Sequence, residues 1–240
     1  MFFLFPFMLI FSLPNILMAL AAIIPAVWLL MKVYRMDSVE KEPKGLILRL
    51  IGMGMLATVG AIVTETIGSA LINESTLVGK FLMYFVVVAL SEEGFKYLFL
   101  KRTTWTNPNF NYQFDGIVYA VSVSLGFALL ENLSYVFSYG LSVAVVRAVT
   151  AVPGHACFGV FMGVWYGLAK TFEKRGDVQN EKKCLRMAIL IPVLLHGAYD
   201  FIASLEGDYT WILFILFVIC LFFYTNRLLK RQSETDVRIG

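Results

Sequence analysis

Long apolar runs alternate with short polar connections along the whole chain. A bilayer core of about 30 Å is crossed by roughly 20 apolar residues in a helix, and about seven runs of the sequence reach that length. They lie near residues 13–33, 46–67, 77–100, 114–139, 141–169, 185–203 and 209–229. This pattern predicts an all-α protein, a polytopic transmembrane helix bundle with about seven spans.

The first apolar run begins at Phe2 and is too long for one perpendicular span. Pro6 and Pro14 interrupt it, so we expect an interfacial piece before a true span that starts near Leu13. No Lys or Arg precedes the run, whereas a cleaved secretory signal needs a basic start. We therefore expect this segment to remain on the protein.

Composition supports the membrane assignment and excludes several other classes. Apolar residues make up 59% of the 240 residues and charged residues 15%, against about 25% charged in soluble domains. The mean hydropathy is +0.74. A net charge of +3 is too small to indicate a nucleic-acid partner, and the three cysteines have no CxxC spacing that would indicate a disulfide framework or a zinc motif. The lipid bilayer is the expected surrounding.

The basic residues are distributed unevenly between the predicted loops. Of the 20 Lys and Arg residues, 17 fall in the first, third and fifth loops and the C-terminal tail, whereas the even-numbered loops hold only Lys80. Cytoplasmic loops carry an excess of basic residues. The sequence therefore predicts a multi-pass protein of the bacterial cell membrane, with its N-terminus outside and its C-terminus in the cytoplasm.

Nine ionisable residues fall inside the predicted spans. They are Glu65, Glu92, Glu93, Lys96, Glu131, Arg147, His155, His196 and Asp200. Each would cost about 3 kcal/mol at the bilayer centre if it faced lipid, and the sum would exceed a typical folding stability of about 5–15 kcal/mol. Most of these side chains must therefore meet at an interior polar site, pair with one another or lie near an interface.

Their spacing predicts specific neighbours. Glu92 and Lys96 are four residues apart, as are His196 and Asp200, and such pairs share one face of a helix. Glu93 is three residues from Lys96, so it can also reach that ammonium. At 1.5 Å per residue, Glu92 is expected about 13 Å from the cytoplasmic side.

This set of residues favours hydrolytic chemistry. A carboxylate beside a cavity can take a proton from water and return it to a leaving amine, and a neighbouring His can stabilise the oxyanion that forms. The sequence has no HExxH motif and no evident Ser/His or Cys/His pairing. Peptide hydrolysis by glutamate-activated water is the reaction that these residue types indicate.

Three short motifs on separate spans resemble the PrsW family of bacterial intramembrane proteases. They are Glu92-Glu93-x-x-Lys96, Phe127-x-x-x-Glu131 and His196-x-x-x-Asp200, in that order. Two further segments are similar to the family: the acidic, Pro-ended stretch at residues 34–43 and the stretch around Arg147 and Pro153-Gly154-His155. The resemblance covers residues 30–205 of what we expect to be a single domain over residues 1–240.

The resemblance implies a role for each matched residue, since the family is related to the CAAX prenyl endopeptidases and the Abi/CPBP proteins. Glu92 would be the general base on water, with Glu93 beside it. Glu131 stands where the CAAX enzymes have a His that helps to activate that water. His196 would belong to the oxyanion hole, and Asp200 stands where the CAAX enzymes have an Asn.

Some roles stay open at this stage. An ionised Asp200 cannot donate a hydrogen bond to an oxyanion, so it would be protonated or would only orient His196, and His155 is then a candidate for the missing donor. Lys96, Phe127 and Arg147 are expected as supporting residues. The resemblance also implies the substrate: a membrane-bound protein such as an anti-sigma factor, which PrsW proteins cut first in a stress response.

Three other interpretations compete with a cofactor-free protease. The Glu and His side chains of the same set also have the ligand types of a zinc site, although the CAAX relatives are expected to work without metal. A transporter would use intramembrane Glu, His and Asp as a proton relay, but its inverted repeats are not visible in the sequence. A catalytically inactive membrane scaffold is the third reading.

Overall fold

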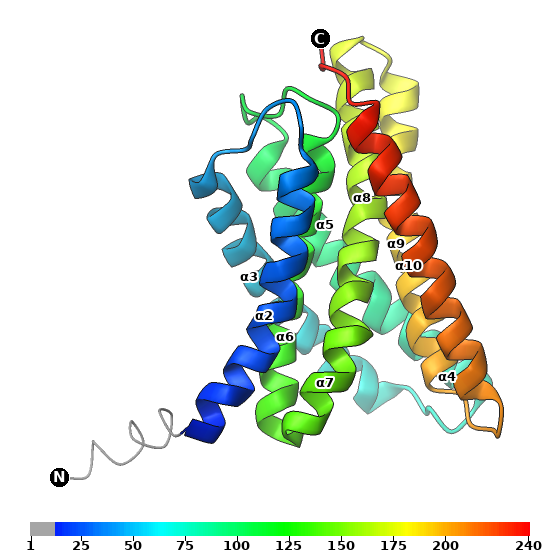
Figure 1. Cartoon of the computed structure of the whole chain (residues 1–240). Coiled ribbons are helices and arrows are strands. Elements are labelled where there is room, and N and C mark those ends of the chain that lie inside the picture. Colours follow the sequence, from blue (N-terminus) through cyan, green and yellow to red (C-terminus); the bar gives the residue numbers. More distant parts are fainter. Residues whose placement is uncertain (1–12) are drawn as a thin grey trace.

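The computed structural model describes residues 13–240, and these fold as helices joined by short connections (Figure 1). The helical elements are α2 (Leu13–Met36), α3 (Lys44–Leu71), α4 (Leu77–Phe81), the π-helix η1 (Leu82–Ala89), α5 (Leu90–Thr104), α6 (Asp115–Tyr139), α7 (Leu141–Val149), α8 (Ala151–Lys174), α9 (Val178–Ala203) and α10 (Thr210–Glu234). The interfacial piece expected before Leu13 lies outside the described residues.

Six helical runs of the described chain are long and apolar enough to cross a membrane: α2, α3, α6, the combined α7–α8 run, α9 and α10. A further run from Leu77 to Thr104 joins α4, η1 and α5 without a break. The predicted all-α transmembrane bundle with about seven spans is therefore confirmed. The described chain starts at one end of the bundle and finishes at the other, as an odd number of crossings requires (Figure 1).

The central helix of the bundle is α6. In its most apolar stretch 78% of the residues are buried inside the protein, against 17% in α2 and 22% in α10. Helices α8, α3 and α2 pack around it. The main core cluster joins Phe114, directly before α6, to Val121 of α6 and Val160 of α8. The outer helices expose their apolar side chains, which is the pattern of lipid-facing helices.

Glycines allow α6 and α8 to approach closely. A Cβ atom added to Gly163 would lie 2.4 Å from the Cα of Ile117, and one added to Gly167 would lie 2.2 Å from the carbonyl oxygen of Gln113. Small residues at such crossings let helix backbones pack tightly within a membrane. The separation of these two helices matters for the site, because α6 carries Glu131 and α8 carries His155.

The C-terminal segment folds back on the connection before α6. Ile239 N–H donates to the Asn111 carbonyl at 2.7 Å, and Gln113 N–H donates to the Val237 carbonyl at 3.0 Å. The connections at this end of the bundle are the basic loops of the sequence, whereas α7, the start of α10 and the connections at residues 72–76 and 204–209 lie at the opposite end (Figure 1).

We predict that Gly163→Ala lowers the free energy of unfolding by about 1–3 kcal/mol, because the added methyl group meets backbone atoms that cannot move aside easily. Gly52→Ala on α3 is the control. A Cβ atom at Gly52 meets nothing within 4 Å, so this variant should be neutral or gain up to about 1 kcal/mol from helix propensity. Unfolding in mixed micelles measures both, and equal effects would contradict the tight α6–α8 contact.

Candidate active site

The glutamate pair lies in the first turn of α5, the helix that continues directly from the π-helix η1. A π-helix is rare and often marks a functional site, because its wider turn changes the direction of the side chains that follow. Glu92 and Glu93 are both buried, at 4% and 0% exposure. Helix α9 lies close to η1 at Gly197, where an added Cβ would come within 2.4 Å of the Phe85 ring. This approach brings His196 to the glutamate pair.

Lys96 is the centre of the polar cluster. Its Nζ lies 2.8 Å from Glu93 Oε1, 3.1 Å from Glu92 Oε2 and 3.1 Å from His155 Nδ1. The three donors of an ammonium are thus matched by three acceptors. The ammonium also lies 4.0 Å from the centre of the Phe127 ring, in a cation–π contact. Lys96 is completely buried.

These contacts assign the protonation of His155. Because its Nδ1 faces an ammonium, Nδ1 must accept, and Nε2 therefore carries the proton of the neutral ring. Nε2 lies 2.9 Å from Glu131 Oε2 and donates to it. His155 thus connects the Lys96 centre to Glu131.

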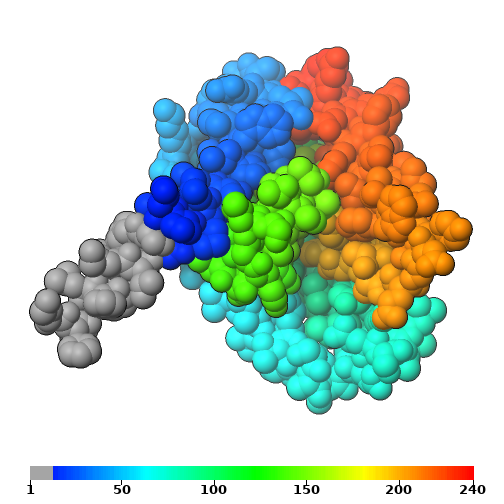
Figure 2. Space-filling view, turned by 60° about the horizontal axis from the view of Figure 1, so that its bottom comes forward, coloured from blue at the N-terminus to red at the C-terminus, as the bar shows by residue number. Residues whose placement is uncertain are grey.

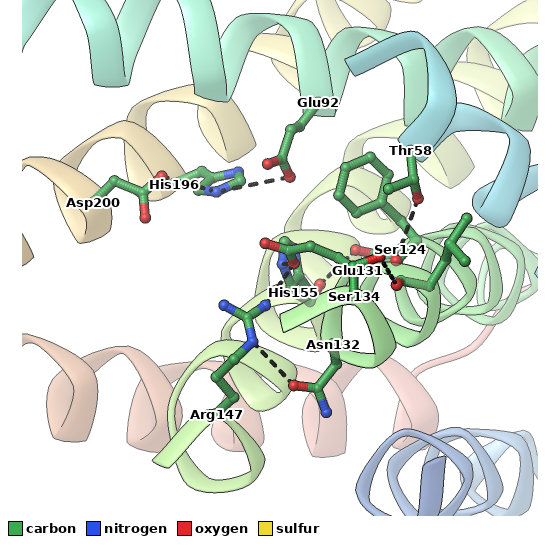
Figure 3. Close-up of polar contacts among 12 residues, drawn as sticks. Thr58, Glu92, Ser124, Glu131, Asn132, Ser134, Arg147, His155, His196 and Asp200 are labelled. Atoms are coloured by element: carbon green, nitrogen blue, oxygen red, sulfur yellow. Dashed lines mark hydrogen bonds and ion pairs between the residues drawn. The ribbon is translucent and has the colours of Figure 1, made fainter. Parts of the chain in front are cut away.

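The second histidine lies between carboxylates. His196 Nδ1 is 2.9 Å from Glu93 Oε1, and Nε2 is 3.2 Å from Asp200 Oδ2 and 3.9 Å from Glu92 Oε2. A doubly protonated ring satisfies both sides, since each nitrogen then donates to a carboxylate. Figure 3 shows His196 between Asp200 and Glu92, on the opposite side of the site from Glu131 and Arg147.

Arg147 closes the other side of the site. Its Nη2 lies 2.8 Å from Glu131 Oε2, and its Nε donates to Asn132 Oδ1 at 3.0 Å (Figure 3). Asn132 in turn donates to the Ala22 carbonyl of α2 at 3.1 Å. Arg147 is on α7, and the chain bends at Thr150 before α8 begins, so the short helix places a cation over Glu131.

A cavity of about 660 Å³ opens onto this cluster. The predicted site residues on its wall are Glu92, Phe127, Glu131, Arg147, His155, His196 and Asp200. Glu93 and Lys96 lie behind that wall and have no exposed surface. The wall extends through Tyr84 to Glu74 and to Ala203, near the end of the bundle that carries α7 and the start of α10. Figure 2 views that end, with α7 in green, the start of α10 in orange and the α4 region in cyan.

Comparison with known proteins gives the family. The family model described as "PrsW family intramembrane metalloprotease" matches residues 42–225. The chain belongs to the PrsW family. Protease PrsW of Oceanobacillus iheyensis is 36% identical over 90% of this chain and 96% of its own length. Protease PrsW of Shouchella clausii is 35% identical over 92% and 99%, and that of Bacillus subtilis 34% over 90% and 96%. No solved structure matches the chain.

Membership of the PrsW family confirms the predicted intramembrane protease and favours it over the transporter alternative. The structure brings together all of the predicted site residues, including the supporting residues Lys96, Phe127 and Arg147. The predicted Glu92–Lys96 and His196–Asp200 neighbours are both present.

Several polar residues around the site were not among the predicted site residues, and two of them, Asn132 and Glu65, lie next to its charged groups. Asn132 anchors Arg147, and its place directly after Glu131 inside an apolar span was a signal that could have found it. Glu65 was counted among the ionisable residues of the spans but not assigned to the site. It lies on the cavity wall, with Oε1 buried and without a hydrogen-bond partner in the described chain.

The PrsW family model is described as a metalloprotease, so the residues of this site can be compared with what a metal ion requires. Glu92, Glu93, His155 and His196 bring ligand atoms within 4.8 Å of one another, and zinc accepts this combination of carboxylates and imidazoles. The Lys96 ammonium, however, contacts three of the four residues at 2.8–3.1 Å. A metal ion at this centre would meet a buried cation. The four residues as arranged therefore do not fit a metal ion, and no step is assigned to one.

We predict that Lys96→Met lowers the free energy of unfolding by about 3–5 kcal/mol, because it leaves two buried carboxylates without their cation. Adding Glu93→Gln to that variant should recover part of the loss, since it removes one of the unpaired charges. The exposed Lys183→Met is the control. Denaturation in mixed micelles measures the three variants, and a Lys96→Met protein as stable as Lys183→Met would disprove the central role of this ammonium.

Proposed function

We propose that this protein is a glutamate-dependent intramembrane endopeptidase, with residues 1–240 forming one protease domain and Glu92 acting as the general base on water. The observation that carries the proposal is the different position of the two glutamates. Glu92 is on the wall of the cavity, where water and a peptide can reach it, whereas Glu93 lies behind it against Lys96 and His196. Glu93 is then a positioning residue.

The Lys96 ammonium supports this role of Glu92. It neutralises the negative charge of the pair at the back of the cavity, so a carboxylate can stay buried near the middle of a helical run. Glu92 then accepts a proton from a water molecule as that water attacks the peptide carbonyl. The same carboxyl group returns the proton to the leaving amine, which completes hydrolysis without a cofactor.

Hydrogen-bond donors on the cavity wall are suited to the oxyanion. The positively charged His196 ring is next to Glu92, and its Nε2–H, held by Asp200 at 3.2 Å, can be shared with a developing oxyanion that the charge of the ring also stabilises. Asp200 thus orients His196 and need not donate itself. On the opposite wall, Arg147 supplies a positive charge and His155 a ring N–H. Both contact Glu131 Oε2. Glu131 is then the residue that positions these two.

We further propose that the substrate is a single-span membrane protein, such as an anti-sigma factor, which the enzyme cuts first in activating a stress response. In support, the cavity opens toward the end of the bundle opposite the Lys- and Arg-rich loops. If those loops are cytoplasmic, the opening faces outward, with the N-terminus outside. The cavity also accounts for how Glu92, expected about 13 Å from the cytoplasmic side, is reached from the other side.

Glu92→Gln should abolish cleavage, with a loss of about 10²–10⁴-fold, while the protein remains folded. The measurement is cleavage of single-span membrane protein fragments, anti-sigma factors included, by detergent-solubilised enzyme. Glu93→Gln should also lose activity, because His196 and Lys96 lose their common partner. The exposed Glu234→Gln is the control and should cleave as the wild type does. A folded Glu92→Gln protein with wild-type activity would refute the proposed base.

Asp200→Asn should retain more activity than Asp200→Ala, because an amide oxygen can still accept from His196 Nε2. Loss of an oriented oxyanion donor costs about 10²–10³-fold in other enzymes, and we expect Asp200→Ala to approach that range. The readout is kcat against pH for both variants in the same cleavage assay. Equal rates for the two variants would contradict an orienting role for Asp200.

A further inference from the structure

A second buried acidic cluster lies at the opposite end of the bundle from the mouth of the cavity. Asp37 and Glu42 come from the connection between α2 and α3, and Asp115 is the first residue of α6. Their exposures are 1%, 2% and 0%. One oxygen atom from each lies within 4.8 Å of the others. Two segments that are far apart in the sequence, the α2–α3 connection and the start of α6, therefore direct three carboxylates to one point.

Several oxygen atoms of this cluster are unsatisfied. Both side-chain oxygens of Asp37 and Oδ1 of Asp115 are buried without a hydrogen-bond partner among residues 13–240. Other carboxylate oxygens of the same cluster do have hydrogen-bond donors. Asp115 Oδ2 accepts from the backbone N–H groups of Asn111 and Tyr112, at 3.0 and 2.7 Å, and Glu42 Oε2 accepts from the Tyr119 hydroxyl at 2.6 Å. Buried polar atoms without partners are rare in native proteins.

A fourth carboxylate borders the cluster. Asp236, in the segment after α10, accepts from the backbone N–H of Phe114 at 2.9 Å through Oδ1, while its Oδ2 is buried and unpartnered. Asp236 is also close enough to Asp37 to disfavour ionisation of that residue. The C-terminal segment thus joins the α2–α3 connection and the start of α6 around the same point.

The nearest lysine does not neutralise these groups by direct contact. The Lys41 ammonium donates to the backbone carbonyl groups of Tyr34, Arg35 and Asp37. Burial, together with neighbouring carboxylates, raises the pKa of Asp37 to about 6 and that of Glu42 to about 7. The ionised forms are therefore unfavourable here without a cation, and among residues 13–240 no Lys or Arg side chain forms an ion pair with this cluster.

We infer that Asp37, Glu42 and Asp115 bind a hard divalent cation, Mg²⁺ or Ca²⁺, with Asp236 as an outer partner. The donors are oxygen atoms only, which these ions prefer, and the set lacks the imidazole and thiolate groups that favour zinc. Residues 38–41 beside the cluster are exposed, so an ion can enter from solvent. Bound there, the ion would fasten the α2–α3 connection and the C-terminal segment to the first turn of α6.

This ion would be structural and is independent of the proposed catalytic mechanism. Helix α6 is the central helix and carries Glu131 sixteen residues beyond Asp115. Securing its first turn to two other segments therefore stabilises the bundle without contact with Glu92.

Thermal unfolding of the full chain in detergent, after removal of metal with chelator, tests the site. Mg²⁺ or Ca²⁺ should raise Tm in a saturable manner, by roughly 5–10 °C at a hundredfold excess over Kd. Asp37→Asn should abolish the rise. Glu40→Gln removes a carboxylate of the same exposed connection and should keep the rise, and Glu92→Gln should keep it as well. A rise that is lost in Glu92→Gln but kept in Asp37→Asn would move the ion to the other cluster and overturn the inference.

A measurement of ion binding to the wild-type chain tests the site even if the Asp37→Asn protein does not fold. Mn²⁺ binding to the wild-type chain, followed by electron paramagnetic resonance, should show one site per chain that Mg²⁺ or Ca²⁺ displaces. Absence of such a site, together with a Tm that does not respond to either ion, would mean that the carboxyl groups are satisfied by protonation and would overturn the inference.

Discussion

The arrangement of the site depends on one ammonium group buried among carboxylates. Lys96 holds Glu92, Glu93 and His155 within hydrogen-bond distance at a depth where a lone carboxylate would be too costly. Its cation–π contact with Phe127 fixes it to α6 as well. Without this cation the two adjacent glutamates would repel each other in a medium of low dielectric constant, and one of them would have to leave the core or take a proton.

From this centre two chains of hydrogen bonds and ion pairs extend to the cavity. One passes through His155 to Glu131 and Arg147, and the other passes through Glu93 to His196 and Asp200. Charges of opposite sign alternate from Lys96 through Glu93 and His196 to Asp200, and in the other chain the neutral His155 links Lys96 to the Glu131–Arg147 ion pair. The cavity lies between the two chains, and Glu92 is the carboxylate at their junction that solvent can reach.

Much of this could be predicted from the sequence, because the physical signals are local. The spans follow from apolar runs, and the Glu92–Lys96 pair follows from the four-residue period of a helix. That Glu92 faces the cavity while Glu93 lies behind it could not be predicted, since that difference depends on the π-helix before them and on the close approach of α9. The meeting of Asp37 with Asp115 depends on tertiary folding, so no local pattern could have revealed it.

The claim that a lysine occupies the cation position of the catalytic cluster is tested most directly by the metal content of active enzyme. The protein would be purified in detergent, its peptidase activity measured, and its zinc, iron, cobalt and manganese determined by mass spectrometry before and after treatment with a transition-metal chelator. The account predicts full activity with transition-metal content far below one per chain. Activity that rises and falls in proportion to one bound transition metal per chain would contradict it.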